Sequence, residues 1–145
     1  MIRTYLDESL RTFRIGCLLS SVTTLGCASE KALVLLFDAY GDALTGQRKD
    51  KYRGDTEGRP IKKKIDEFNK RLESHLMALL PGDIKEHLDI ALTALSAIFR
   101  EMRNDAGHPT GKTVEREAAY ANLLVFPVYL KKVYELIGWL KTNQL

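Results

Sequence analysis

The sequence predicts an all-α protein: an antiparallel four- to five-helix bundle that forms a single domain over residues 1–145. Apolar residues recur every three or four positions along four long segments, which is the period of a helix with one buried face. The chain has almost no alternating strand pattern, and the segments are joined by short connections, as in helix bundles. A length of 145 residues with 45% hydrophobic residues suits one domain with its own core.

The first helical pattern covers residues 18–40, where apolar residues such as Leu18, Leu25 and Leu36 are spaced by three or four positions. Residues 5–15 carry a shorter pattern of the same kind. One long bent helix or two short helices would both explain these residues. Residues 45–59 contain three glycines and little that is apolar, which predicts an exposed loop.

Proline and acidic residues indicate where the later helices begin and end. Pro60 suits the first turn of a helix that ends at Pro81-Gly82. Asp83 can cap the next helix, whose apolar stripe runs to Arg103. Thr113, followed by two glutamates, predicts the capped start of a last helix, and Pro127 predicts a kink within it.

Composition also favours a cytoplasmic protein with no membrane partner. No apolar run approaches the roughly 20 residues of a membrane span, and residues 1–13 lack the apolar region of a signal peptide. Cys17 and Cys27 are ten positions apart on a predicted helix, about 15 Å and too far for a disulfide, so we expect reduced core residues. Three histidines without a cysteine cluster predict no metal site.

Positive charge is concentrated in one part of the chain. Residues 45–64 hold eight basic and three acidic residues, a net charge of +5, which leaves −2 for the remainder. Such a segment can bind the phosphates of RNA, and it can equally be a solvated loop followed by a charged helix start. Tyr52 could stack on a base there, or simply lie at the tip of the loop. The predicted RNA-binding residues are Arg48, Lys49, Lys51, Arg53, Lys62, Lys63 and Lys64.

The segment with the best candidates for catalytic residues joins the last two predicted helices. Its sequence, R-N-D-A-G-H, places Arg103, Asn104 and His108 within six residues. An arginine presents a planar fork of donors to phosphate oxygens, and a histidine can move a proton near neutral pH. The same residues also suit a plain helix end, because cations are favourable near the negative end of the helix dipole.

This segment resembles the R-x4-6-H signature of HEPN (higher eukaryotes and prokaryotes nucleotide-binding) domains, small helical bundles in which the motif follows a long helix. The order of elements is similar too: two opening helical segments, a variable loop, a helix pair, the motif and a final helix. Residues 26–32, G-C-A-S-E-K-A, resemble the helix of small residues and a glutamate found in many family members. The likeness of architecture covers nearly all of the chain.

The resemblance implies a metal-independent endoribonuclease without cofactors, of the kind found among toxins and antiphage defence effectors. Arg103 would bind the scissile phosphate, His108 would act as general acid or base, and Asn104 would orient both. Glu30 would position the arginine or the histidine, unless it pairs at the surface with Lys31 or Arg14. The resemblance further implies a homodimer that brings two motifs to one cleft, and a protein partner such as an antitoxin.

Two other interpretations were weighed against this one. Some HEPN proteins have lost catalysis, so the alternative is a non-catalytic dimeric module that binds RNA, a nucleotide or a protein. Residues 106–113, A-G-H-P-T-G-K-T, also approximate a phosphate-binding loop. Such a loop must follow a strand, whereas the residues before it have a helical period, so we reject it. His75 and His87 are expected on helices, at the surface.

Overall fold

The computed structural model describes residues 1–101 and 113–145, and all regular structure in these ranges is helical. This confirms the all-α class. The elements are α1 (Ile2–Arg14), α2 (Leu18–Ala43), α3 (Gly46–Thr56), α4 (Ile61–Arg71), the π-helical turn η1 (Leu72–Leu76), α5 (Met77–Leu79), α6 (Gly82–Lys85), α7 (Leu88–Glu101) and α8 (Arg116–Thr142).

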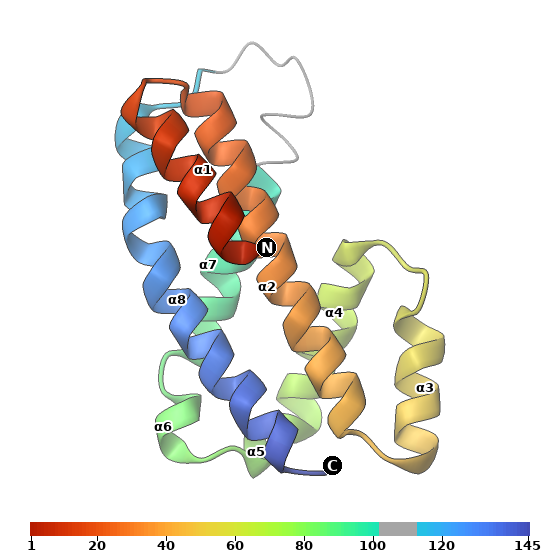
Figure 1. The fold of residues 1–145 in the computed structure, drawn as a ribbon. Coiled ribbons are helices and arrows are strands. Elements are labelled where there is room, and N and C mark those ends of the chain that lie inside the picture. The colour runs from red at the N-terminus through yellow and green to blue at the C-terminus, as the bar shows by residue number, and fades with distance from the viewer. Residues whose placement is uncertain (102–112) are drawn as a thin grey trace.

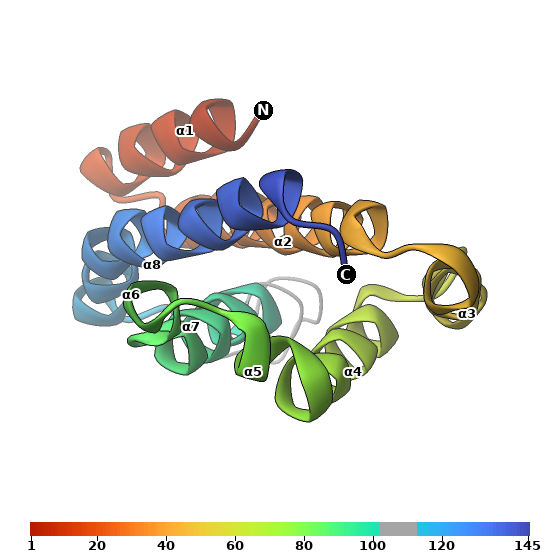
Figure 2. The ribbon, with the colours of Figure 1, turned by 90° about the horizontal axis from the view of Figure 1, so that it is seen from below.

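The helices form three layers, which Figure 2 shows end on. Helix α1 is one outer layer, α2 and α8 form the middle layer, and α7 with the α4–α5 segment forms the third. Consecutive long helices alternate in direction, as an antiparallel bundle requires, while α2 and α8 run side by side in the same direction (Figure 1). Helix α3 stands at the edge of the bundle, where it contacts the end of α2 and helix α4.

The opening segment is two helices rather than one bent helix. The chain turns at Gly16, whose φ of 79° is a conformation that favours glycine. The buried hydroxyls of Ser9 and Ser21 then join α1 to α2, because each donates to the other residue's carbonyl, at 2.7 and 2.9 Å.

The predicted apolar stripes of α2 and α8 face the core. Leu25 and Leu36 of α2 are buried, as are Phe126 and Val133 of α8. Helix α2 is long and apolar enough to cross a membrane, contrary to the expectation that no apolar run is long enough. It contacts α1, α7 and α8, and the core helix of a soluble protein passes the same test of length and composition.

Residues 45–59 differ most from expectation, because they form helix α3 instead of an exposed loop. Tyr52 and Thr56, four positions apart, are both buried, and Tyr52 is only 3% exposed. The Tyr52 ring lies edge-on to Tyr40 of α2, with 5.0 Å between the ring centroids. Two buried side chains on one face are enough to fix a helix that is otherwise polar, because tertiary contacts outweigh weak local propensity.

Two predicted helix boundaries are also corrected. The helix expected from Asp83 is divided into α6 and α7, and His87 between them has a φ of 59°. Thr113 does not cap the last helix, which begins at Arg116 after Glu115 with no side-chain cap hydrogen bond. Helix α8 continues through Pro127 to Thr142.

Candidate functional site

The predicted catalytic segment lies between two described helix ends. Arg103, Asn104 and His108 fall outside the described residues. Helix α7 ends at Glu101 and α8 begins at Arg116, and these two ends lie at the same end of the bundle (Figure 1). The amide of Asn122 donates to the Glu101 carboxylate at 2.8 Å, which ties the end of α7 to the first turns of α8.

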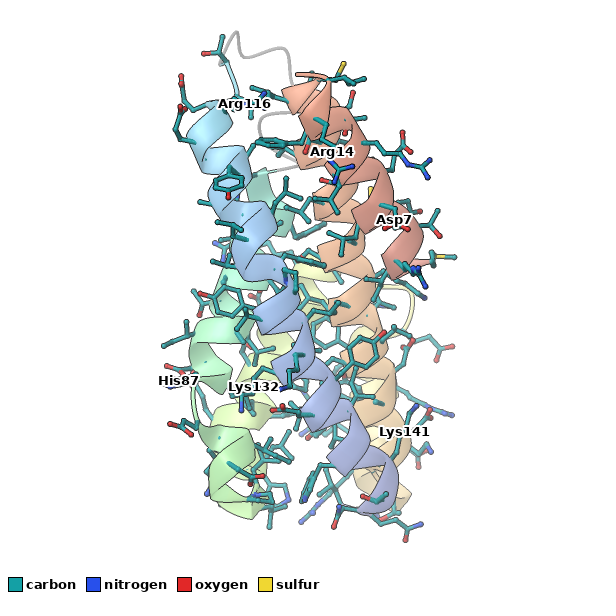
Figure 3. The ribbon with its side chains drawn as sticks, turned by 60° about the vertical axis from the view of Figure 1, so that its left-hand side comes forward. Asp7, Arg14, His87, Arg116, Lys132 and Lys141 are labelled. Atoms are coloured by element: carbon teal, nitrogen blue, oxygen red, sulfur yellow. The ribbon has the colours of Figure 1, made fainter. Side chains whose placement is uncertain are left out.

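Arginines of three helices gather at this end of the bundle. Arg14 ends α1, Arg100 lies in the last turn of α7 and Arg116 starts α8. Figure 3 labels Arg14 and Arg116 near one another at the end where α8 begins. Arg116 lies over the ring of Phe13, 4.5 Å from its centroid, where a cation is attracted by the π-electrons. Arg116 could not be predicted as a site residue, because nothing in the sequence around it indicates that α1 ends beside α8.

Glu30 lies half-buried on α2, twelve residues or about 18 Å of helix beyond Leu18, where α2 begins at this end. Its neighbour Ser29 is fully buried and donates to the carbonyl of Leu95 in α7 at 2.6 Å. Leu95 precedes Glu101 by six residues, about 9 Å along a helix. Among the described residues, no ion pair joins Glu30 to Lys31 or Arg14.

Neither cysteine belongs to the core. Cys17 is exposed just before α2 and Cys27 is half-buried within it, so the expectation that both lie in the core is wrong. Both are free thiols. Burial raises the pKa of Cys27, and the nearby Glu30 carboxylate raises it further, so this thiol stays protonated at neutral pH.

The basic segment does not form one continuous surface. The structure separates its residues onto two sides of α3. On one side, Lys49 and Arg53 approach the Asp42 carboxylate at 3.9 and 3.8 Å, and Lys64 lines a cleft of about 540 Å³. Asp38 and Glu57 line the same cleft, so its acidic residues outnumber its basic ones.

The other side of α3 faces α4 and η1 and has a different character. Arg48 and Lys51 line a second cleft, of about 480 Å³, together with Lys70, Arg71 and His75. His75 is half-buried, and its Nε2 lies 3.1 Å from Nη1 of Arg48. This histidine is therefore in contact with a residue of the basic segment. Lys62 and Lys63 are exposed in the first turn of α4.

Tyr52 separates the two sides and is unavailable for stacking on a base. Its ring is buried between Tyr40 and the guanidinium of Arg71, which lies 5.1 Å from the ring centroid. The expectation of an exposed tyrosine in a basic loop is therefore wrong. Burial raises the pKa of Tyr52, and the neighbouring Tyr40 adds to the shift while Arg71 opposes it.

The described residues also bear on the rejected phosphate-binding loop and on metals. Residues 33–38, the apolar run that could resemble a strand, lie within α2, and residues 91–101 before the loop lie within α7. Among residues 1–101 and 113–145, no three His, Cys, Asp or Glu side chains gather in a way that could hold a metal ion.

Comparison with known proteins adds no relative: no family model, curated protein or solved structure matches the chain. Any functional assignment therefore depends on the residues themselves.

Proposed function

We propose that the protein is a metal-independent endoribonuclease of the HEPN type. The observation that carries this proposal is the R-N-D-A-G-H segment, residues 103–108, which directly follows a core helix of an all-helical bundle. The arginines Arg14, Arg100 and Arg116 at the adjoining helix ends support it, because positive charge near a reaction centre attracts the phosphates of RNA.

The proposed reaction is transesterification within the RNA backbone. His108 as a base takes the proton of the 2′-hydroxyl, and the 2′-oxygen attacks the adjacent phosphorus. The bond from phosphorus to the 5′-oxygen breaks, and the leaving oxygen takes up a proton from water. The products are a 2′,3′-cyclic phosphate and a 5′-hydroxyl. Arg103 stabilises the charge that develops on the phosphate oxygens, with Asn104 orienting both side chains. Glu30 is a candidate positioning residue.

The test is incubation of the purified protein with transfer RNA and messenger RNA in excess EDTA. We expect cleavage that leaves cyclic phosphate ends. His108→Ala should lower the cleavage rate by about 10²–10⁴-fold with little loss of binding, because its role is proton transfer in the transition state. Arg103→Ala should lower both the cleavage rate and the affinity for RNA. His87→Asn is the matched control, since His87 is exposed and asparagine tolerates its positive φ.

Other outcomes would be equally informative. Cleavage that requires a metal and leaves a 3′-hydroxyl would contradict the chemistry. Loss of cleavage in His87→Asn to the same degree as in His108→Ala would contradict the assignment of the residues. Tight RNA binding without any cleavage would favour the alternative, a non-catalytic RNA-binding module.

A further inference from the structure

A second site is indicated at the opposite end of the bundle, in the cleft between α3, α4 and η1. Ser29 of α2 contacts Leu95 of α7, so these two residues lie at the same height in the bundle. Tyr40, eleven residues further along α2, lines the cleft. That separation is about 16 Å of helix, and Glu101 lies about 9 Å beyond Leu95 in the other direction. The cleft and the end of α7 are therefore about 25 Å apart along the bundle.

The cleft carries an excess of positive charge. Its lining includes four cations, Arg48, Lys51, Lys70 and Arg71, and two carboxylates, Asp55 and Glu67. Both carboxylates are bound by Arg71, at 2.6 Å for Asp55 and in direct contact for Glu67. Among the described residues, no carboxylate pairs with the other three cations.

Arg71 is a fixed part of the wall. It is 17% exposed, and its contacts join α4 to α3 through Asp55. Burial lowers the pKa of Arg71, but its hydrogen bonds to Glu67 and Asp55 outweigh burial and raise the pKa overall. This buried guanidinium therefore stays charged, and its carboxylates are not free to neutralise Arg48, Lys51 or Lys70.

Arg48 and His75 form the polar pair of the cleft, although they are 27 residues apart in the chain. A guanidinium can only donate, so Nε2 of His75 is the acceptor in this contact and Nδ1 remains available to donate. The contact uses only Nη1 of Arg48, and its other nitrogens have no partner among the described residues. The remaining guanidinium nitrogens of Arg48 are therefore available to donate hydrogen bonds to an oxygen ligand.

The π-helical turn η1 accounts for the position of His75. Leu72 and Leu76 are both buried, and the wider turn between them carries Ser74 and His75 to the cleft. Single π-helical turns within α-helices are rare, and many lie at functional sites.

We propose that this cleft binds phosphate groups, with Arg48, Lys51, Lys70 and His75 as the contacting side chains. The free nitrogens of Arg48, the ammonium groups of Lys51 and Lys70, and Nδ1 of His75 are the donors that this cleft offers to phosphate oxygens. The source of the phosphate is either a free phosphate ester or the backbone of RNA. This site does not depend on nuclease activity at residues 103–108.

The experiment follows the ring protons of His75 by NMR during titration with inorganic pyrophosphate and, separately, with a 12-nucleotide single-stranded RNA. Both use the Arg103→Ala/His108→Ala variant, so that the RNA is not cleaved. His75→Gln identifies the His75 signals, and the exposed His87 is the internal reference. Arg48→Gln/Lys51→Gln should weaken pyrophosphate binding by about tenfold or more, since charge-assisted hydrogen bonds are lost.

The matched control is Arg11→Gln/Lys141→Gln, which also removes one arginine and one lysine, from exposed positions of α1 and α8 outside the cleft. We expect this control to retain at least half of the affinity for pyrophosphate. If both probes change the chemical shifts of the His75 ring protons, and pyrophosphate competes with the RNA for binding, the cleft binds RNA backbone phosphates. Shifts with pyrophosphate alone would assign it to a free phosphate ester. Unmoved His75 signals with both probes, or equal weakening by the two double variants, would overturn the proposal.

Discussion

Tyr52 is the residue that attaches α3 to the bundle. Its ring lies edge-on to Tyr40, its hydroxyl points to the carbonyl of Phe37 at 3.4 Å, and Arg71 covers its face. Gly41 makes room for it, because a Cβ at that position would come within 3.1 Å of the Tyr52 ring. A single aromatic residue in a polar segment carries no periodic signal, which is why the sequence alone did not place Tyr52 in the core.

Burial of Tyr52 makes stability depend on pH in the alkaline range. Because its pKa is raised above 10 in the folded protein, the folded state holds the proton more tightly than the unfolded state. The resulting stabilisation is fully present below about pH 10 and is lost as the pH rises further. In Tyr52→Phe, we expect the free energy of unfolding to fall less steeply above about pH 10 than in the parent protein.

Urea unfolding from neutral pH to about pH 11 measures this difference. An identical slope for Tyr52→Phe and the parent would mean that the hydroxyl of Tyr52 is in contact with water.

At the scale of elements, the sequence predicted the helices with long apolar stripes and missed those set by tertiary contacts. The core helices α2, α7 and α8 follow from the spacing of residues such as Leu36, Leu95 and Phe126. Helix α3 has a mostly polar sequence, and the π-helical turn η1 interrupts a stripe that periodicity treats as continuous. Arg48 and His75 meet only because of these two features, so no spacing rule could have paired them.

Helices α2 and α7 are joined at mid-height by Ser29, whose hydroxyl donates to Leu95. Ser29→Ala should lower the free energy of unfolding by about 1 kcal/mol, the typical contribution of one hydrogen bond. The cost should not be much larger, because a helix carbonyl such as that of Leu95 retains its backbone partner.

Chemical denaturation of Ser29→Ala and of Ser20→Ala checks this prediction. Ser20 is an exposed serine of the same helix, so its substitution controls for the higher helix propensity of alanine. If the two variants were equally stable, the bond between α2 and α7 would contribute nothing to the fold.

At the scale of the whole molecule, the outer face of α8 is the surface on which we expect the homodimer to form. The apolar stripe predicted from the sequence is buried in the core, so it is not available to a second copy. The opposite face is also apolar, with Tyr120, Leu124, Val128 and Tyr134 between 47% and 66% exposed. Figure 3 shows this helix in front, uncovered by other elements along most of its length.

The charges on this face suit an antiparallel pairing of two α8 helices. Glu117 and Lys131 are both exposed, and each lies seven residues from Leu124, a heptad on either side. With Leu124 of each copy at the two-fold axis, Glu117 faces Lys131 of the second copy and Tyr120 faces Val128. In this pairing the two α8 helices begin at opposite ends of the pair, because Arg116 of each copy lies eight residues, about 12 Å of helix, from Leu124 at the axis.

Charge exchange across the axis tests this dimer. Glu117→Lys alone or Lys131→Glu alone places like charges opposite each other, and each variant should shift the species toward the 16.4 kDa monomer. The double variant Glu117→Lys/Lys131→Glu restores opposite charges and should recover the dimer. Leu124→Lys should abolish it, whereas Leu79→Lys, at an exposed leucine outside α8, should not. Light scattering across micromolar concentrations distinguishes these species. A parent protein that is monomeric throughout, or single charge variants that dimerise as well as the parent, would show that α8 does not form the interface.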